Sequence, residues 1–134
     1  MTRVFADTFY FLALLNPKDT AHAKAAALTL SFVGEMTTTA WVLTELGDAL
    51  SRPANRPNFL ATVDQLQSNS QAHIVRPDAK LFAEGIELFR SRPDKEWSLT
   101  DCISFVVMKR EGIAEALTVD HHFEQAGFVA LLKS

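Results

Sequence analysis

The sequence predicts an α/β fold in which a mainly parallel central sheet is covered by helices on both faces. Short apolar runs of strand length alternate along the whole chain with longer segments of helical periodicity. Strands separated by helices in this way pair in parallel. The chain has 134 residues, 48% of them hydrophobic and 22% charged, which is enough for one domain with a core and too few for two.

The first half of the chain is expected to begin with a strand that leads straight into a helix. The buried run Val4–Ala6 passes through Asp7 and Thr8 into the apolar segment Phe9–Leu15, which has helical length. A polar break then separates this helix from the next. The elements expected after the break are a helix Ala21–Leu30 capped by Asp19 or Thr20 and ended by Gly34, a strand Met36–Thr38, and a helix Thr39–Leu50.

The second half repeats the alternation, and its boundaries carry clear start and stop signals. Pro57 suits the start of a helix, Asp78 after Pro77 suits a helix cap, and Gly112 suits a helix end. The expected elements are a helix Pro57–Asn69, a strand His73–Val75, a helix Asp78–Ser91, a helix Ser98–Gly112, a strand Ala116–Val119, a helical turn His122–Gln125 and a strand Phe128–Leu132.

Asp101 lies in the first turn of a helix that is apolar almost all the way round and is therefore predicted to be buried. Ser98 and Asp101 have the S-x-x-D spacing of a capping box, and the helix dipole favours an acid at this position. A purely structural role is thus one interpretation. The other is functional, because an acid in a buried helix is costly.

Three further acids occupy comparably constrained positions. Asp7 and Asp120 each follow an expected strand, so a parallel sheet would place both at its carboxyl edge, where sites are built. Glu45 lies beside the apolar stripe of the helix Thr39–Leu50, with Trp41 one turn back, as at the rim of a cleft. Singly, these acids could be a helix cap, a turn residue and a solvated helix acid. Together with Asp101 they predict a shared acidic site.

Composition excludes several classes of protein. No uncharged apolar run approaches the roughly 18 residues of a membrane-spanning helix. Arg3 precedes the apolar stretch Phe9–Leu15, but Asp7 intervenes and no cleavage pattern follows, so a signal peptide is not expected. We therefore expect a cytoplasmic protein without membrane association. The single cysteine, Cys102, allows no internal disulfide and is expected to be a packing residue.

The formal net charge of −3 argues against simple electrostatic coating of nucleic acid. An acidic centre can still bind a polyanion through a divalent metal ion, which reverses the local sign of charge. Arg52 and Arg56 could hold a flanking RNA backbone, as could three cations near Trp97, although each could equally be a solvated loop charge. Those three are Arg90, Arg92 and Lys95.

His121 and His122 follow Asp120 directly and suggest a transition metal. Adjacent histidines are expected to point in different directions, and no third histidine or cysteine has matching spacing, so zinc ligation is not expected. His122 is interpreted as a polar packing residue or a phosphate contact.

These residues together resemble the PIN domain, and in particular the small VapC-like ribonuclease toxins. The resemblance spans essentially the whole chain, and its most specific part pairs Ser98-Leu-Thr-Asp101 with Thr118-Val-Asp120-His-His-Phe123. It implies a three-layer α/β/α fold with a mainly parallel central sheet, Mg²⁺ or Mn²⁺ held by acids, RNA hydrolysis and a cognate antitoxin. The family's four acidic positions fall on Asp7, Glu45, Asp101 and Asp120, and a small polar residue that often follows the first falls on Thr8.

Phosphodiester hydrolysis needs an activated water and neutralisation of the charge that develops on the leaving oxygen, and hard cations held by carboxylates supply both. Asp7 and Asp101 are the expected direct ligands of a principal ion, with Glu45 and Asp120 completing its shell or holding a second ion. Without metal, the four acids should repel one another and raise at least one pKa. The polar neighbours expected to support the acids are Thr8, Ser98, Thr100 and Thr118.

Two other classes of protein also place an Asp after their first strand. A phosphatase of the haloacid-dehalogenase type needs a second Asp where this chain has Phe9, and a response-regulator receiver needs an acidic pair where Asp7 stands alone. The serious alternative is a non-catalytic module of the same fold that binds RNA or a protein. The apolar faces of Phe9–Leu15 and Ala21–Leu30 fit a homodimer or an antitoxin groove, and they fit core packing equally well.

Overall fold

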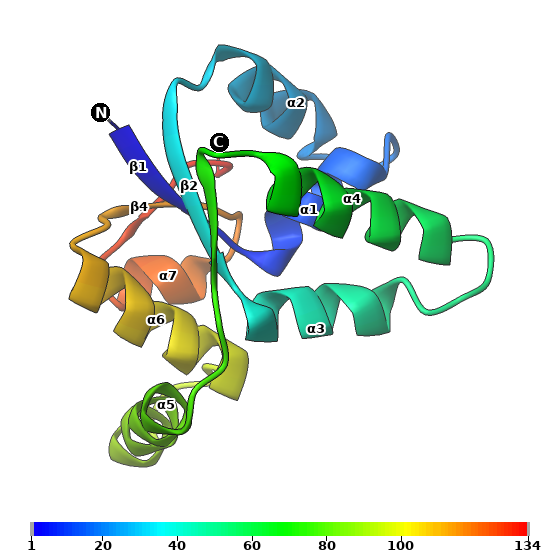
Figure 1. The fold of residues 1–134 in the computed structure, drawn as a ribbon. Helices are drawn as coiled ribbons and strands as arrows, with labels where there is room; N and C mark the ends of the chain where they lie inside the picture. The colour runs from blue at the N-terminus through cyan, green and yellow to red at the C-terminus, as the bar shows by residue number, and fades with distance from the viewer. Residues whose placement is uncertain (1, 134) are drawn as a thin grey trace.

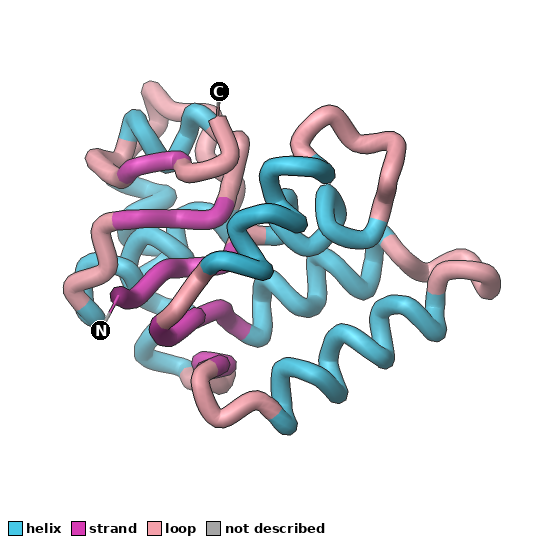
Figure 2. Tube along the Cα trace, turned by 90° about the horizontal axis from the view of Figure 1, so that it is seen from above, coloured by secondary structure: helices cyan, strands magenta, loops and turns pink. Residues whose placement is uncertain are grey.

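The computed structural model describes residues 2–133. Its sheet has five strands in the order β3-β2-β1-β4-β5, and all four strand pairings are parallel. Figure 2 shows the strands side by side with helices on both sides of the sheet. The strands are β1 (Thr2–Ala6), β2 (Gly34–Thr39), β3 (Ala72–Val75), β4 (Glu115–Leu117) and β5 (Val129–Ala130).

Helices connect every strand to the next, as parallel pairing requires. Figure 1 shows α5, α6 and α7 on the opposite side of the sheet from α2 and α4. The predicted three-layer α/β/α architecture is therefore confirmed. The helices are α1 (Thr8–Leu15), α2 (His22–Ser31), α3 (Ala40–Ala49), α4 (Arg56–Ser68), α5 (Ala79–Ser91), α6 (Leu99–Glu111) and α7 (His121–Gln125).

The apolar core lies on both faces of the central strand β1. On one face, Phe5 packs against Phe123 of α7 with ring centroids 6.3 Å apart, and Phe123 meets Phe105 of α6 edge to face at 4.9 Å. Helix α6 is buried along most of its length, as predicted, and Cys102 within it is fully buried. No helix within residues 2–133 is long and apolar enough to cross a membrane.

Gly34 was expected to end the second helix, and this expectation is wrong. Helix α2 ends at Ser31, and Gly34 instead begins β2, paired with Thr2 of β1. A Cβ atom on Gly34 would lie 2.0 Å from the Thr2 carbonyl oxygen, and its φ of +150° also disfavours a side chain. The glycine is needed because two backbones approach closely there, a tertiary fact that its neighbours in sequence do not show.

A second close approach joins helices α5 and α6, the pair that supports one side of the sheet's carboxyl edge. A Cβ atom added to Gly85 of α5 would lie 2.3 Å from Cγ1 of Ile103, a fully buried residue of α6. The missing side chain therefore sets how closely the two helices pack.

We predict that Gly85→Ala destabilises the protein by about 1–3 kcal/mol from overpacking, more than the helix-propensity gain of about 1 kcal/mol can offset. Chemical denaturation of the variant and the wild type measures the difference. In an Ile103→Ala background the clashing atom is absent, so the same substitution should cost nothing or stabilise. An equal loss in both backgrounds would show that the Ile103 side chain is not the cause.

Candidate active site

The pairing of β1 with β4 places two polar residues together at the carboxyl edge of the sheet. Ala6 is aligned with Leu117, and Asp7 and Thr118 are the next residues on each strand. The Asp7 backbone N–H donates to the Leu117 carbonyl at 3.3 Å, and the Thr118 hydroxyl donates to Oδ2 of Asp7 at 3.0 Å. The first predicted acid is thus held by a residue 111 positions away in the chain.

Asp7 precedes α1 in an N-cap position, yet its side chain makes no capping hydrogen bond. Only 2% of the residue is exposed, so its carboxyl group is removed from water without the usual structural reason. Burial, then the negative charge of Asp101 and, more weakly, that of Glu45, raise the pKa of Asp7 to about 7. Hydrogen bonds from Thr118 and the Thr8 backbone oppose that rise.

Asp101 fulfils the capping box predicted from the sequence and also faces the site. The Ser98 hydroxyl accepts from the Asp101 backbone N–H at 3.0 Å, and Oδ2 of Asp101 accepts from the Ser98 backbone N–H at 3.1 Å. Burial, and after it the charge of Asp120, raise the pKa of Asp101, while hydrogen bonds from Ser98 and His122 lower it. The predicted rise in carboxyl pKa is confirmed, but burial contributes more to it than repulsion does.

Asp120 is the N-cap of α7, and its Oδ1 accepts from the His122 backbone N–H at 2.9 Å. The Thr118 hydroxyl, which donates to Asp7, also accepts from the Asp120 backbone N–H at 3.0 Å. One hydroxyl group therefore connects two of the predicted acids.

The imidazole of His122 lies between two carboxylates. Its Nδ1 is 3.3 Å from Oδ2 of Asp101 and 3.3 Å from Oδ1 of Asp120. Sequence reasoning interpreted His122 only as a packing residue or phosphate contact and missed this position. The signal available in the sequence was its place two residues after a helix-capping acid.

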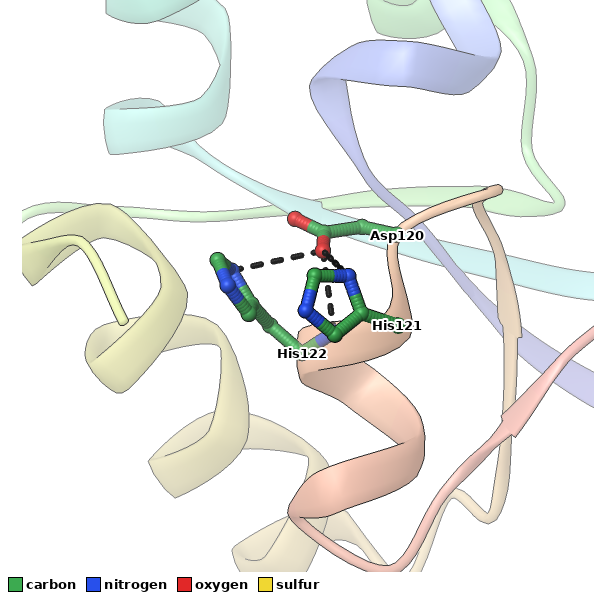
Figure 3. A group of neighbouring side chains, drawn as sticks. All are labelled: Asp120, His121 and His122. Carbon is green, nitrogen blue, oxygen red and sulfur yellow. Dashed lines mark hydrogen bonds and ion pairs between the residues drawn. The ribbon is translucent and has the colours of Figure 1, made fainter. Parts of the chain in front are cut away.

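The expectation that His121 and His122 point in different directions is wrong. Their rings lie 4.4 Å apart, and Nδ1 of each approaches Oδ1 of Asp120, at 3.7 Å and 3.3 Å (Figure 3). Both rings fold back toward the one carboxylate that caps their helix. Ligand atoms of these three residues lie within 4.8 Å of one another, a group that could hold a metal ion.

Glu45 lies on the exposed side of α3 and its charge raises the pKa of Asp7. The charge of Asp101 also raises the pKa of Asp7, and the charge of Asp120 raises the pKa of Asp101. The four predicted acids are therefore linked by electrostatic interactions. Asp7, Asp101 and Asp120 form the inner part of this group, and Glu45 lies at its exposed rim.

The predicted supporting residues differ in what they do. Thr118 and Ser98 bond to acids as expected, whereas Thr100 contributes its carbonyl to Ser104, and no bond from its hydroxyl to an acid is found within residues 2–133. Thr8 is buried, and its hydroxyl oxygen has no hydrogen-bond partner in the described part of the chain. An unsatisfied buried hydroxyl beside Asp7 marks a place for a further polar ligand.

The predicted RNA contacts are both exposed: Arg52 lies in the connection from α3 to α4, and Arg56 begins α4. The guanidinium Nε of Arg56 donates to the Ser51 carbonyl at 2.8 Å. Helix α3 starts at the carboxyl edge of the sheet and has ten residues, about 15 Å of length, so both arginines lie at its far end.

Comparison with known proteins identifies relatives of this chain. The PIN domain family profile matches residues 4–129. The 23S rRNA-specific endonuclease VapC20 of Mycobacterium tuberculosis is 29% identical over 126 residues, 94% of this chain and 95% of the relative. The crystal structure of VapC20, described as a sarcin-ricin loop cleaving toxin, superposes with a TM-score of 0.85 at 28% identity, covering 94% and 96% of the two chains.

More distant structures share the fold. VapBC2 from Rickettsia felis, crystallised with a promoter DNA fragment, matches with a TM-score of 0.66 at 14% identity, over 96% of this chain and 97% of that one. FitAcB from Neisseria gonorrhoeae matches with a TM-score of 0.64 at 18% identity, over 95% and 94%. At these identities the likeness concerns the fold alone.

The raised pKa of Asp7 predicts how the stability of the metal-free protein depends on pH. Between the unfolded pKa near 3.8 and the folded pKa near 7, the native state binds more protons than the unfolded state. Stability should therefore fall as pH rises through this window and level off above it. At about 1.4 kcal/mol for each unit, the loss is on the order of 4 kcal/mol.

The Asp7→Asn variant has no carboxyl group at position 7, so its free energy of unfolding should fall less over the same pH range. Urea denaturation in EDTA at pH 4, 5.5 and 7.5 compares the two proteins, and the free energies of unfolding should diverge in favour of the variant as pH rises. Parallel curves for wild type and variant would mean that Asp7 ionises normally.

Proposed function

The chain belongs to the PIN domain family, and on this premise we propose that it is a metal-dependent endoribonuclease and the toxin of a toxin–antitoxin pair. The observation that carries the proposal is the convergence of Asp7, Asp101 and Asp120 at the carboxyl edge of the sheet, with Glu45 at the rim. The 23S rRNA endonuclease VapC20 matches the chain over 94% of its length, which supports RNA as the substrate class.

The donor set fits a hard divalent cation such as Mg²⁺ or Mn²⁺. Such ions prefer carboxylate and other oxygen ligands, and here the carboxyl groups of Asp7 and Asp101 are buried, while Thr8, the next residue after Asp7, has an unsatisfied hydroxyl. The acids that we propose as direct ligands are Asp7 and Asp101, with Glu45 and Asp120 completing the shell. A bound cation would activate the attacking water and neutralise charge on the leaving oxygen.

The chain's own residues prepare this site. Thr118 fixes the Asp7 carboxylate through its hydroxyl and holds the turn that presents Asp120. Ser98 fixes the orientation of Asp101 through the capping box, and His122 spans Asp101 and Asp120. We propose that these three residues position the acids, so that little reorganisation is needed when an ion and a phosphodiester bind.

We propose that a cognate antitoxin, a second copy of the chain, or both bind the surface near α1 and α2. We also propose that the protein is cytoplasmic. Leu30 and Val33 at the end of α2 are 89% and 83% exposed, which is unusual for large apolar side chains near each other in sequence. The description of VapC20 as a toxin supports an antitoxin among these partners.

We predict that the purified protein cleaves RNA in the presence of Mg²⁺ or Mn²⁺ and not in excess EDTA, because its acids cannot approach phosphate unaided. Gel analysis of a fragment of 23S rRNA measures cleavage. Asp7→Asn and Asp101→Asn should each lose most activity while keeping the circular dichroism spectrum of the wild type.

The two variants, purified in the same way, also control for contaminating ribonuclease. Cleavage that persists in EDTA, or that is equal in the variants, would refute the proposed activity. RNA binding without any cleavage by the wild type would instead favour the alternative, a non-catalytic PIN-fold binding module.

A second prediction concerns Asp101 and stability. Without metal, Asp101→Asn should melt at the same temperature as the wild type or higher, because one of the neighbouring negative charges is gone while the asparagine oxygen can still accept from Ser98. Added Mg²⁺ should raise the melting temperature of the wild type more than that of the variant, since an ion that binds only the native state stabilises it.

The alternative is that Asp101 serves only as a helix-capping acid. The variant would then be less stable by a few tenths to about 1 kcal/mol at every Mg²⁺ concentration. That loss, combined with equal shifts by Mg²⁺ in both proteins, would argue against a shared metal site. Differential scanning fluorimetry over a Mg²⁺ titration provides the measurement.

A further inference from the structure

Two cavities adjoin one another across the α5–α6 side of the molecule, outside the acidic site. They share Arg92 and Trp97, and the Arg92 guanidinium lies 5.1 Å from the centre of the Trp97 ring. The cavity nearer to the start of α6 has a volume of about 350 Å³, and the one nearer to its end about 270 Å³. We call them the near cavity and the far cavity.

All the charged side chains that line these cavities are cations. Arg90, Arg92 and Lys95 line the near cavity, and Arg92 and Lys109 line the far one. This is unexpected in a chain with a formal net charge of −3. A cation-lined hollow on an acidic protein is complementary to a polyanion.

The cations differ in whether a neighbouring acid neutralises their charge. Arg92 is held by Asp94 through bonds of 3.0 and 2.9 Å and forms the wall between the cavities. Arg90 has an exposed partner in Glu87 at 3.4 Å. The ammonium groups of Lys95 and Lys109 make no ion pair or hydrogen bond with any residue from 2 to 133, so their charges are available to a ligand.

The near cavity lies at the start of α6, the helix that carries Asp101. Its lining includes Cys102, which follows Asp101, and Trp97, which precedes the capping residue Ser98. Lys95 comes six residues before Asp101 in the chain, whereas Arg52 and Arg56 lie at the far end of α3.

Aromatic and apolar groups alternate with the cations. Phe89 of α5 is 52% exposed and lines the near cavity, and the half-buried Phe128 lines the far cavity in front of the buried core residue Phe105. Proteins that bind single-stranded nucleic acid combine positive charge along the backbone with aromatic faces for bases and sugars. The chemistry of the two cavities matches that combination.

We propose that the near and far cavities bind the phosphate backbone of the RNA on one side of the cleaved bond, with Lys95 and Lys109 as the principal phosphate contacts. The inference rests on the proposed function, because it takes RNA as the substrate. It assigns the strand's path from the acids along α6, and it accounts for how an acidic protein holds a polyanion beyond the reach of its metal.

The test uses Lys95→Gln/Lys109→Gln in an Asp7→Asn background that leaves the RNA intact. The matched control is Lys18→Gln/Lys24→Gln in the same background, which removes two exposed lysines on the α1–α2 side. Fluorescence anisotropy with a labelled RNA hairpin that carries single-stranded arms gives the affinity in Mg²⁺ over a range of salt concentrations. Melting temperatures verify that both proteins are folded.

Each lost phosphate contact should lower the slope of log affinity against log salt by about one, so the cavity variant should lose about two and the control none. In the otherwise wild-type protein, the cavity substitutions should raise KM for a long RNA more than they raise KM for a dinucleotide. Equal slopes and affinities for the cavity variant and the control would overturn the proposal and leave the cavities to a protein partner.

The outcomes separate this inference from the proposed function. If wild-type protein cleaves RNA but the cavity variant behaves as the control does, only the inference fails. If wild-type protein cleaves nothing while the cavity variant still loses salt dependence, the nuclease assignment fails and the binding surface stands. Absence of RNA binding in every protein would overturn both.

Discussion

The burial of one carboxyl group, that of Asp7, is the constraint on which the rest of the site depends. Asp7 ends the central strand β1, so parallel neighbours and helices surround it, and it gives up hydration without gaining a helix cap. Its surroundings compensate only in part, through Thr118 and the Thr8 backbone, and the pKa of Asp7 stays well above its ordinary value. A buried carboxylate of this kind destabilises the folded protein unless a cation or a proton neutralises it. Such acids therefore suggest a functional site.

Asp101 and Asp120 show that the structural and the functional interpretation of an acid need not exclude each other. Asp101 completes a capping box, and Asp120 caps α7, so each contributes to local stability. The same hydrogen bonds fix both carboxylates at the carboxyl edge of the sheet, where His122 lies 3.3 Å from each. A cap is an economical way to orient a ligand, because the backbone N–H groups that hold the carboxylate belong to a rigid helix. Of the three buried or half-buried acids, Asp7 alone lacks such a local role.

Much of the fold was predictable from the sequence because strand and helix periodicities, the cap at Asp78 and the capping box at Ser98 are local signals. Asp7 and Asp120 were predicted from the rule that parallel strands end at a common edge, whereas Asp101 and Glu45 were predicted from the apolar patterns of their helices. What the sequence could not supply is which strands are neighbours. The adjacency of β1 and β4, the bond from Thr118 to Asp7, and the close approach that requires Gly34 all join residues distant in the chain. His122 was missed for the same reason, since its second acid, Asp101, comes from another helix.

The distribution of charge explains how an acidic chain could act on RNA. Four acids near one sheet edge attract cations and repel phosphate, so a metal ion can hold only the phosphodiester that lies directly upon it. Screening limits the reach of any such ion to about 8 Å at physiological salt, which is little more than one nucleotide. Residues outside that radius must supply their own positive charge if they are to hold a strand. In this molecule Lys95, in the loop before α6, lines the near cavity, and Lys109, in the last turn of α6, lines the far cavity. On the path that we propose, the acids would hold the metal ion while Lys95 and Lys109 would hold the RNA on one side of the cleaved bond.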